Sequence, residues 1–427
     1  MSNLIFAVSG GRNAFGQPGM PAGLRRLVGS GLLVAVGYID PGNWATDIAG
    51  GSRFGYHLLM IVFGAAFLAL GFQVLVTRLA LATGEDLAAL TLRHLPRPLA
   101  RAAWLAGEAA ILATALAELV GGAIALRLLF QIPLMAGVAM TGAGTYAVLL
   151  FARNNADRHE RIIGALLAIV SMSFVFLLFK ANPAWTAVMQ EAASPAAALR
   201  EPEGFMIALG ILGATLMPHN LYLHSGSLAQ RARDLPAAMR PIAMQVARTD
   251  TLFSLGIATL INAAIMIVAA ASLSGAGLAI TSLDQAHAVI AKSLGAGAAV
   301  VFAVALYAAG QSSTITGVLA GKVLSKGFGA SGWSDRRRAL VTRAVAGAAA
   351  MGMLAYTGGQ NPDQLLVLSQ VILSLALPFA LVPLVMLATR GDVMGTFVLR
   401  GVWRAAAIAA TMAIIALDAY LLAAQFL

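Results

Sequence analysis

The 427-residue sequence contains no cysteine, and only 11% of its residues are charged. Without cysteine the chain forms no disulfide and has no thiolate ligand, so a bound metal must be held by oxygen, imidazole or thioether groups. The sequence also lacks a glycine-rich phosphate loop and a helix with the metalloprotease spacing of two histidines around a glutamate. We therefore expect no cofactor and no enzymatic activity.

Hydrophobic residues make up 59% of the chain, and the mean hydropathy is +0.84. A water-soluble domain of this composition would aggregate. Apolar runs that can cross about 30 Å of hydrocarbon at 1.5 Å per residue predict an all-α polytopic membrane protein with eleven spans. The predicted spans lie near residues 25–52, 55–82, 101–128, 131–152, 161–181, 205–228, 249–273, 296–320, 338–357, 364–389 and 401–425.

The basic residues fall unevenly on the two sides of this predicted membrane protein. With the N-terminus in the cytoplasm, the 28 Lys and Arg residues lie inside except for Arg53, Arg127, Lys180, Arg200 and Lys292. This asymmetry predicts a cytoplasmic N-terminus and an extracytoplasmic C-terminus. It also accounts for the net charge of +10, so we expect a lipid bilayer and no nucleic acid as partner. Residues 1–24 read as a cytoplasmic tail, because their apolar run is too short for a signal peptide.

Two polar motifs interrupt predicted spans, DPGN at residues 40–43 and MPHN at residues 217–220. A helix broken at membrane depth is tolerated only where the freed backbone faces protein or a water-filled cavity, and paired breaks mark the central site of many transporters. The breaks lie five spans apart, so the second unit enters the membrane from the opposite side. The sequence thus predicts inverted repeats at 25–182 and 205–389, with an additional helix at 401–427.

The two breaks gather potential ligands for a divalent cation. Asp40 offers a carboxylate, Asn43 an amide oxygen and Met217 a thioether, and the breaks expose main-chain carbonyls, notably those of Gly37 and Ala214. A carboxylate at mid-membrane costs at least about 2.5 kcal/mol, which a partner must offset. The thioether favours transition metals over calcium or magnesium. DPGN is also an ordinary turn sequence and methionine a common core filler, but the membrane setting favours the metal site.

The segments DPGNWATDIAGGSRFGY, GATLMPHNLYLHS and YAAGQSSTITGVLAGKVLSKGF closely resemble helix signatures of the Nramp family of proton-coupled divalent metal transporters. The resemblance covers essentially the whole chain. It implies a LeuT-like fold and the import of manganese or iron(II) together with protons. We therefore expect a multi-pass protein of the cell inner membrane that works by alternating access and requires no oligomer.

The resemblance also implies roles for individual residues. Its metal ligands are Asp40, Asn43 and Met217 with the carbonyls of Gly37 and Ala214, joined by Gln370 when the site occludes. Its proton-pathway residues are Glu118 with its partner Arg343, the histidines His219 and His224, and the more remote Glu108.

One position departs from the family pattern. The family usually reads Thr-Asp-Leu-Ala-Glu in the third span, whereas this chain has Ala115 in place of the aspartate. Two interpretations follow: protons leave Asp40 through Glu118 or His219 and water, or the protein is an uncoupled facilitator for divalent metals. A LeuT-like organic-solute transporter is a third alternative, but there Asp40 would repel a substrate carboxylate.

The remaining polar residues of the spans receive simpler predictions. Asp47 either adds negative potential to an outer vestibule or is simply solvated near a helix end, and we expect the second. We expect Asp250 to cap the beginning of the seventh span. The polar run that includes Ser312 and Ser313 either lines a pathway or joins helices by hydrogen bonds. Asp418 has no predicted role.

Overall fold

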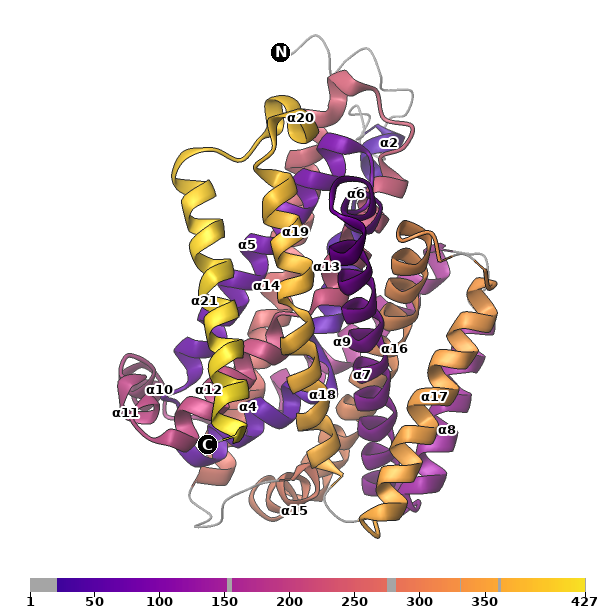
Figure 1. Cartoon of the computed structure of the whole chain (residues 1–427). Coiled ribbons are helices and arrows are strands. Elements are labelled where there is room, and N and C mark those ends of the chain that lie inside the picture. The colour runs from indigo at the N-terminus through magenta and orange to yellow at the C-terminus, as the bar shows by residue number, and fades with distance from the viewer. Residues whose placement is uncertain (1–20, 152–155, 275–281, 331, 360–361, 427) are drawn as a thin grey trace, which may run out of the picture.

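The computed structural model describes residues 21–151, 156–274, 282–330, 332–359 and 362–426. These residues form helices and connecting turns without any strand, which confirms the all-α prediction. Figure 1 shows the long helices side by side in one bundle, with α2 (Ala22–Arg25) at one end and the end of α21 (Gly401–Phe426) at the other. Residues 1–20 of the predicted tail lie outside the described residues.

Nine helical segments of the described part are long and apolar enough to cross a membrane. They are formed by α5 (Leu59–Thr83), α7 (Arg97–Phe130), α9 (Ala156–Ala181), α12 (Pro202–Thr215) with α13 (Pro218–Arg231), η2 (Ala237–Met239) with α14 (Arg240–Leu273), α16 (Ala296–Gly327), α17 (Asp335–Tyr356), α18 (Asp363–Ala376) with α19 (Pro378–Ala388), and α21. The other two predicted spans, the first and the fourth, correspond to α3 (Ser30–Ala35), η1 (Val36–Ile39) and α4 (Pro41–Phe54), and to α8 (Leu134–Phe151). All eleven predicted spans are therefore helical.

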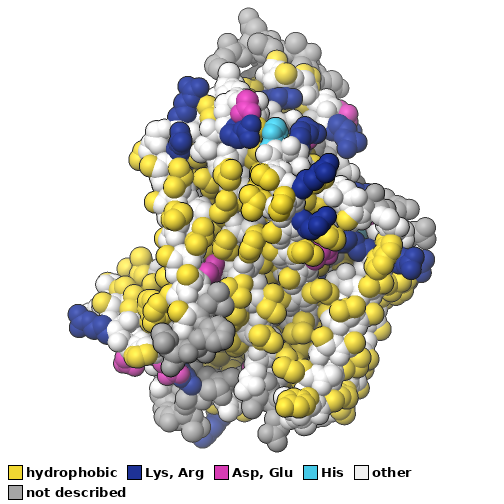
Figure 2. Space-filling view, in the orientation of Figure 1, with side chains coloured by type: hydrophobic (Ala, Val, Ile, Leu, Met, Phe, Trp, Pro, Cys, Tyr) yellow, Lys and Arg dark blue, Asp and Glu magenta, His cyan; other side chains and the backbone are white. Residues whose placement is uncertain are grey.

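Apolar side chains cover the outside of the bundle. Phe67, Phe179, Phe253 and Trp403 are each more than 70% exposed. In Figure 2 apolar atoms form a broad band across the middle of the visible face, and basic side chains gather mainly at the end that carries α2. Exposed apolar surface of this extent marks contact with lipid.

The broken helices lie in the centre of the bundle. The membrane windows of α7, α12–α13 and α16 are mostly buried, whereas those of α17 and α21 are mostly exposed. Trp44 of α4 is fully buried and packs its ring edge-on against Phe174 of α9, with ring centroids 4.9 Å apart. Gly121 of α7 lies so close to Pro41 that a Cβ would collide with the proline ring. This packing holds the first break against the bundle core.

Several short helices were not predicted. They are α6 (Leu87–His94), α10 (Trp185–Ala192), α11 (Ala196–Leu199), α15 (Leu283–Leu294), α20 (Gly391–Met394) and η4 (Gly395–Phe397). Two of them begin at a side-chain cap, since Asp86 accepts from the Ala89 amide of α6 at 2.8 Å and Ser282 from the Gln285 amide of α15 at 3.2 Å. Of these short helices, α10 and α11 both lie in the connection between α9 and α12.

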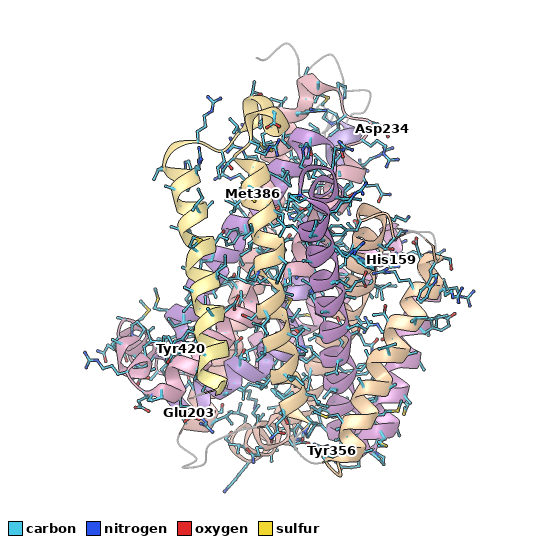
Figure 3. All side chains as sticks on the ribbon, viewed as in Figure 1. His159, Glu203, Asp234, Tyr356, Met386 and Tyr420 are labelled. Atoms are coloured by element: carbon cyan, nitrogen blue, oxygen red, sulfur yellow. The ribbon has the colours of Figure 1, made fainter. Side chains whose placement is uncertain are left out.

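The last helix, α21, contacts the bundle at few places. Tyr420, labelled in Figure 3, packs edge-on against Phe205 of α12 with ring centroids 5.4 Å apart. Two residues before Tyr420, the buried carboxylate of Asp418 accepts a hydrogen bond from Ser374 of α18. Asp418, for which the sequence suggested no role, thus attaches the eleventh span to α18.

Candidate metal centre

The two breaks share one backbone design. Asp40 and Met217 are both extended, at φ −72°, ψ 161° and φ −96°, ψ 117°, and each directly precedes a proline at the first position of the next helix. Because proline has no N–H, the carbonyl four residues earlier loses its helical donor. Those carbonyls belong to Gly37 and Ala214, the two that the sequence predicted.

The side chains of the first break combine capping with free acceptor atoms. Asp40 is fully buried, and its Oδ1 accepts from the Asn43 amide N–H at 2.9 Å, which caps α4. Its Oδ2 has no hydrogen-bond partner. The Asn43 Nδ2 donates to the Tyr38 carbonyl at 2.9 Å, so the amide oxygen of Asn43 faces away from that carbonyl.

A third helix, α18, brings Gln370 to the first break. A Cβ on Gly42 would collide with the Gln370 amide and would stand 3.2 Å from Asp40 Oδ2. The Gln370 Nε2 donates to Ser369 at 3.0 Å, whereas its Oε1 is buried without a partner. The unpaired Asp40 Oδ2 and the side-chain amide of Gln370 therefore lie against the same glycine.

The second break adds sulfur and an amide that the sequence analysis missed. Met217 is 1% exposed, and its Sδ accepts from Asn220 Nδ2 at 3.5 Å. The same Asn220 amide lies against Gly37, where a Cβ would stand 2.8 Å from its Oδ1, and this Oδ1 has no partner. Asn220 occupies in MPHN the place that Asn43 occupies in DPGN, so the symmetry of the two motifs was the signal that could have found it.

The centre therefore has an excess of acceptors. Asp40 Oδ2, Gln370 Oε1 and Asn220 Oδ1 are all buried and unpaired, and no ion pair of the described residues includes Asp40. Buried acceptors without donors are costly unless a cation or water satisfies them. Within the described ranges no three His, Cys, Asp or Glu side chains gather in a metal cluster. A metal bound here would therefore need a mixed set of carboxylate, amide, carbonyl and thioether ligands.

The two histidines of α13 have different surroundings. His224 is fully buried, with Nδ1 2.8 Å from Gln73 Oε1 and Nε2 3.5 Å from the Thr251 hydroxyl. Since Gln73 Nε2 donates to the Tyr38 hydroxyl at 3.0 Å, its Oε1 must accept, and His224 carries its proton on Nδ1. His219 has only a 3.4 Å contact with Thr114, and its Nε2 is unpaired. His219 is thus the histidine with a free ring nitrogen beside the second break.

Glu118 and Arg343 form the expected pair. Arg343 Nη1 donates to the fully buried Glu118 Oε2 at 2.6 Å. Ser313 and Thr314 of α16 also donate to this carboxylate, at 2.9 and 3.1 Å. Ser313 therefore joins α16 to α7 by a hydrogen bond, which decides between the two interpretations of that polar run for this residue. Ala115 is buried, one turn before Glu118.

Glu108 lies apart from the breaks, in the first half of α7. Its carboxylate forms an ion pair with Arg338 of α17 and accepts from the Trp104 indole N–H at 2.9 Å. Both acidic residues of α7 are thus matched to arginines of α17.

Two predictions about acidic residues were wrong. Asp47 is not solvated but 2% exposed, because α14 packs against its face of α4. Asp250 does not begin its own helix, since α14 starts at Arg240. Its carboxylate instead accepts from the backbone amides of Gly29 and Gly31 at 3.0 and 2.7 Å. Asp250 therefore caps α3, a helix 220 residues earlier in the chain.

Comparisons with known proteins agree with this architecture. The family model for Natural resistance-associated macrophage protein-like (Nramp) proteins matches residues 31–424. The "Divalent metal cation transporter MntH" of Brucella suis is 44% identical over 370 residues, which cover 86% of this chain and 81% of that protein. A crystal structure of the manganese transporter of Eremococcus coleocola superposes with a TM-score of 0.84 at 31% identity, covering 96% of this chain and 89% of that one. MHP1, a nucleobase-cation-symport-1 family transporter, shares the fold with a TM-score of 0.58 at 18% identity, over 88% and 82% of the two chains.

Proposed function

Since the chain belongs to the Nramp family, whose similar members are named divalent metal cation transporters, we propose that it imports manganese and iron(II) as a secondary transporter. The observation that supports this most is the trio of buried, unpaired acceptors at the two breaks, on Asp40, Gln370 and Asn220. A bound cation would satisfy those acceptors, and the Met217 thioether lies beside Asn220. Members of this family are membrane transporters, and the proposed transport requires no cofactor.

The proposed ion site uses both breaks. A divalent ion exchanges part of its water shell for Asp40, Asn43 and Met217 and for the freed carbonyls of Gly37 and Ala214. Gln370 completes the shell from α18, where it already lies on Gly42. The thioether supplies the preference for transition metals over magnesium and calcium.

Alternating access follows from the LeuT-like fold. We infer that residues 25–182 and 205–389 are the two inverted repeats, with 401–427 as an additional helix. The helices of the breaks rock relative to their neighbours, so that the ion site opens first to one side and then to the other. α18 must withdraw from α4 for the outer path to open, because Gln370 otherwise covers Gly42.

Proton movement is proposed along the polar residues of α7, α13 and α17. Metal binding requires the ionised form of Asp40, so protons and metal compete for that carboxylate. Glu118 with Arg343, and His219 with its free nitrogen, are the groups that could accept a proton next; His224, which is fully hydrogen-bonded, and Glu108, which is paired with Arg338, lie further along.

Ala115 supports a second candidate function, an uncoupled facilitator, because a carboxylate of the usual proton route is missing. A pH-sensitive dye inside proteoliposomes separates the two. Acidification of the lumen during manganese uptake supports symport, whereas uptake without acidification supports facilitated diffusion.

The orientation is proposed from charge. The end of the bundle that carries α2 also carries most of the visible basic side chains (Figure 2), which supports a cytoplasmic N-terminus and an extracytoplasmic C-terminus. The multi-pass membrane protein then lies in the cell inner membrane, and no partner subunit is needed for the ion site.

The decisive experiment measures manganese uptake by purified protein in proteoliposomes. We expect saturable uptake that iron(II) inhibits and that amino acids do not. Inhibition by amino acids, together with failure of manganese to enter, would instead support an organic-solute transporter.

A further inference from the structure

Asp47 is a second buried carboxylate on α4 that the central site does not use. It follows Asp40 by seven residues, about two helical turns and roughly 10 Å along the axis, so both lie on the same side of the helix. Asp47 is 2% exposed, and its Oδ2 has no hydrogen-bond partner. None of the ion pairs formed by the described residues includes it. A lone carboxylate at membrane depth needs a compensating partner.

The helix that faces Asp47 is α14. A Cβ on Gly50 would stand 3.0 Å from the Met266 methyl carbon, and a Cβ on Gly51 would stand 2.9 Å from the Ala269 Cβ. Asp47 precedes Gly50 by one turn. The fully buried Met266 therefore lies about one turn from Asp47, toward the end of the bundle that carries α15.

An unpaired amide oxygen lies on the same face of α14, one turn before Met266. Asn262 Nδ2 donates to the Tyr38 carbonyl at 2.8 Å, and Asn43 donates to the same carbonyl. Since a carbonyl only accepts, the Asn262 Oδ1 faces away from it, and this Oδ1 is buried without a partner. Along α4, Asn262 therefore lies at the height of Asn43, and Met266 lies at the height of Gly50. Asp47 lies between these two heights.

The described segments of α14, α12 and α16 nearest this cluster carry no positive charge. α14 has no charged residue from Thr251 to Leu273, and α12 has none after Glu203. The central part of α16, from Ala296 to Gly321, is also uncharged. Neutralisation of the Asp47 carboxylate must then come from a bound proton or from a cation that enters from outside the chain.

We propose that Asp47, the Asn262 amide oxygen and the Met266 thioether form a second binding site for a divalent transition metal, about two helical turns beyond Asp40 along α4. This inference rests on the proposed function of the Asp40 site. The second site repeats the carboxylate, amide and thioether chemistry of the central one. An incoming ion then meets two sites in turn that favour transition metals over hard ions such as magnesium. Two divalent ions at this separation repel each other, and an ion that arrives at Asp47 favours the departure of the one at Asp40.

The test is calorimetric titration of the purified full-length protein with manganese chloride, followed by uptake assays. Asp40→Asn should still bind one manganese ion per chain, and Asp40→Asn with Asp47→Asn should bind none. Asp47→Asn alone should keep the central ion but raise the KM of manganese uptake about tenfold. Met266→Leu, which conserves volume, should lower discrimination against magnesium, whereas the neighbouring Ile267→Leu should leave it unchanged.

Other outcomes overturn the proposal. It is wrong if Asp40→Asn binds no ion, or if Asp47→Asn and Met266→Leu match the wild type in KM and in exclusion of magnesium. If Asp47→Asn fails to fold, the comparison of Met266→Leu with Ile267→Leu in discrimination against magnesium decides the question alone. Failure of the proposed function looks different, because the wild type itself would then neither bind nor transport manganese.

Discussion

The two helix breaks have the same backbone but opposite side-chain chemistry. In both, an extended residue precedes a proline that opens the next helix and frees a carbonyl. At the first break Asp40 carries a charge and caps its own helix through the Asn43 amide. At the second break Met217 caps nothing, and its sulfur accepts a weak hydrogen bond from Asn220.

This difference separates two requirements of a metal transporter. The pseudo-symmetric backbone supplies carbonyl oxygens from both sides, which suit any divalent ion. In the proposed site the carboxylate would supply affinity, because it is the one anion there. The thioether would supply the choice among ions, because soft metals gain more from sulfur than hard ones do. Substitution of the key side chain at the first break should therefore change affinity, and substitution at the second break should change selectivity among ions.

Loss of the charge at the first break should have the largest effect. Asp40→Asn keeps an efficient N-cap, so α4 should still form while the anion is gone. We expect manganese uptake in proteoliposomes to fall about 100-fold or more, with an unchanged thermal unfolding temperature. Wild-type uptake by this variant would contradict the assignment of the first break as the source of affinity.

Loss of the contact between α18 and the first break should have the next largest effect on uptake. The methyl group of Gly42→Ala would displace the Gln370 amide from Asp40. We expect Gly42→Ala and Gln370→Ala each to reduce uptake about tenfold. Because both remove one interaction, the double variant should be no worse than either single variant.

The matched control for this cycle is Gly71→Ala in α5, where a Cβ would meet nothing within 4 Å. Its uptake should equal that of the wild type. Additive losses in the Gly42 and Gln370 cycle would show that Gln370 acts elsewhere.

Removal of the sulfur at the second break should change selectivity more than rate. Met217→Leu conserves volume, so we expect manganese uptake to persist. Competition by magnesium or calcium should become about tenfold stronger, equivalent to about 1.4 kcal/mol of lost discrimination. Isotope uptake with unlabelled competitors measures this ratio, and an unchanged ratio would mean that the sulfur only packs.

The two breaks and their candidate ligands could be predicted from the sequence because those features are local. Proline beside an acid or a sulfur inside an apolar run is visible in a short window, and so are the eleven spans. Asp47 and Asp250 were mispredicted because their surroundings come from distant segments. Asp47 is buried by α14, and Asp250 caps a helix that begins at Ser30.

Asn220 was overlooked for a different reason. Its motif position was visible, but its contact with Gly37 depends on how closely the two breaks approach. The boundary between α18, which ends at Ala376, and α19, which begins at Pro378, was not predicted either. The apolar run continues through this boundary without a polar residue. Periodicity and composition therefore define spans and motifs, whereas burial and pairing need the tertiary structure.

The smallest expected effect concerns the two histidines that follow the second break. His224 is hydrogen-bonded to Gln73, which in turn bonds to Tyr38 next to the first break, whereas His219 has no such partner. His224→Ala leaves a buried Gln73 oxygen unpaired, so its free energy of unfolding should fall about 1–3 kcal/mol further than that of His219→Ala. Both variants lose the same side-chain volume, so the difference isolates the hydrogen bonds. Denaturant or thermal unfolding in detergent measures it, and equal losses would mean that the network through Gln73 does not join the two breaks.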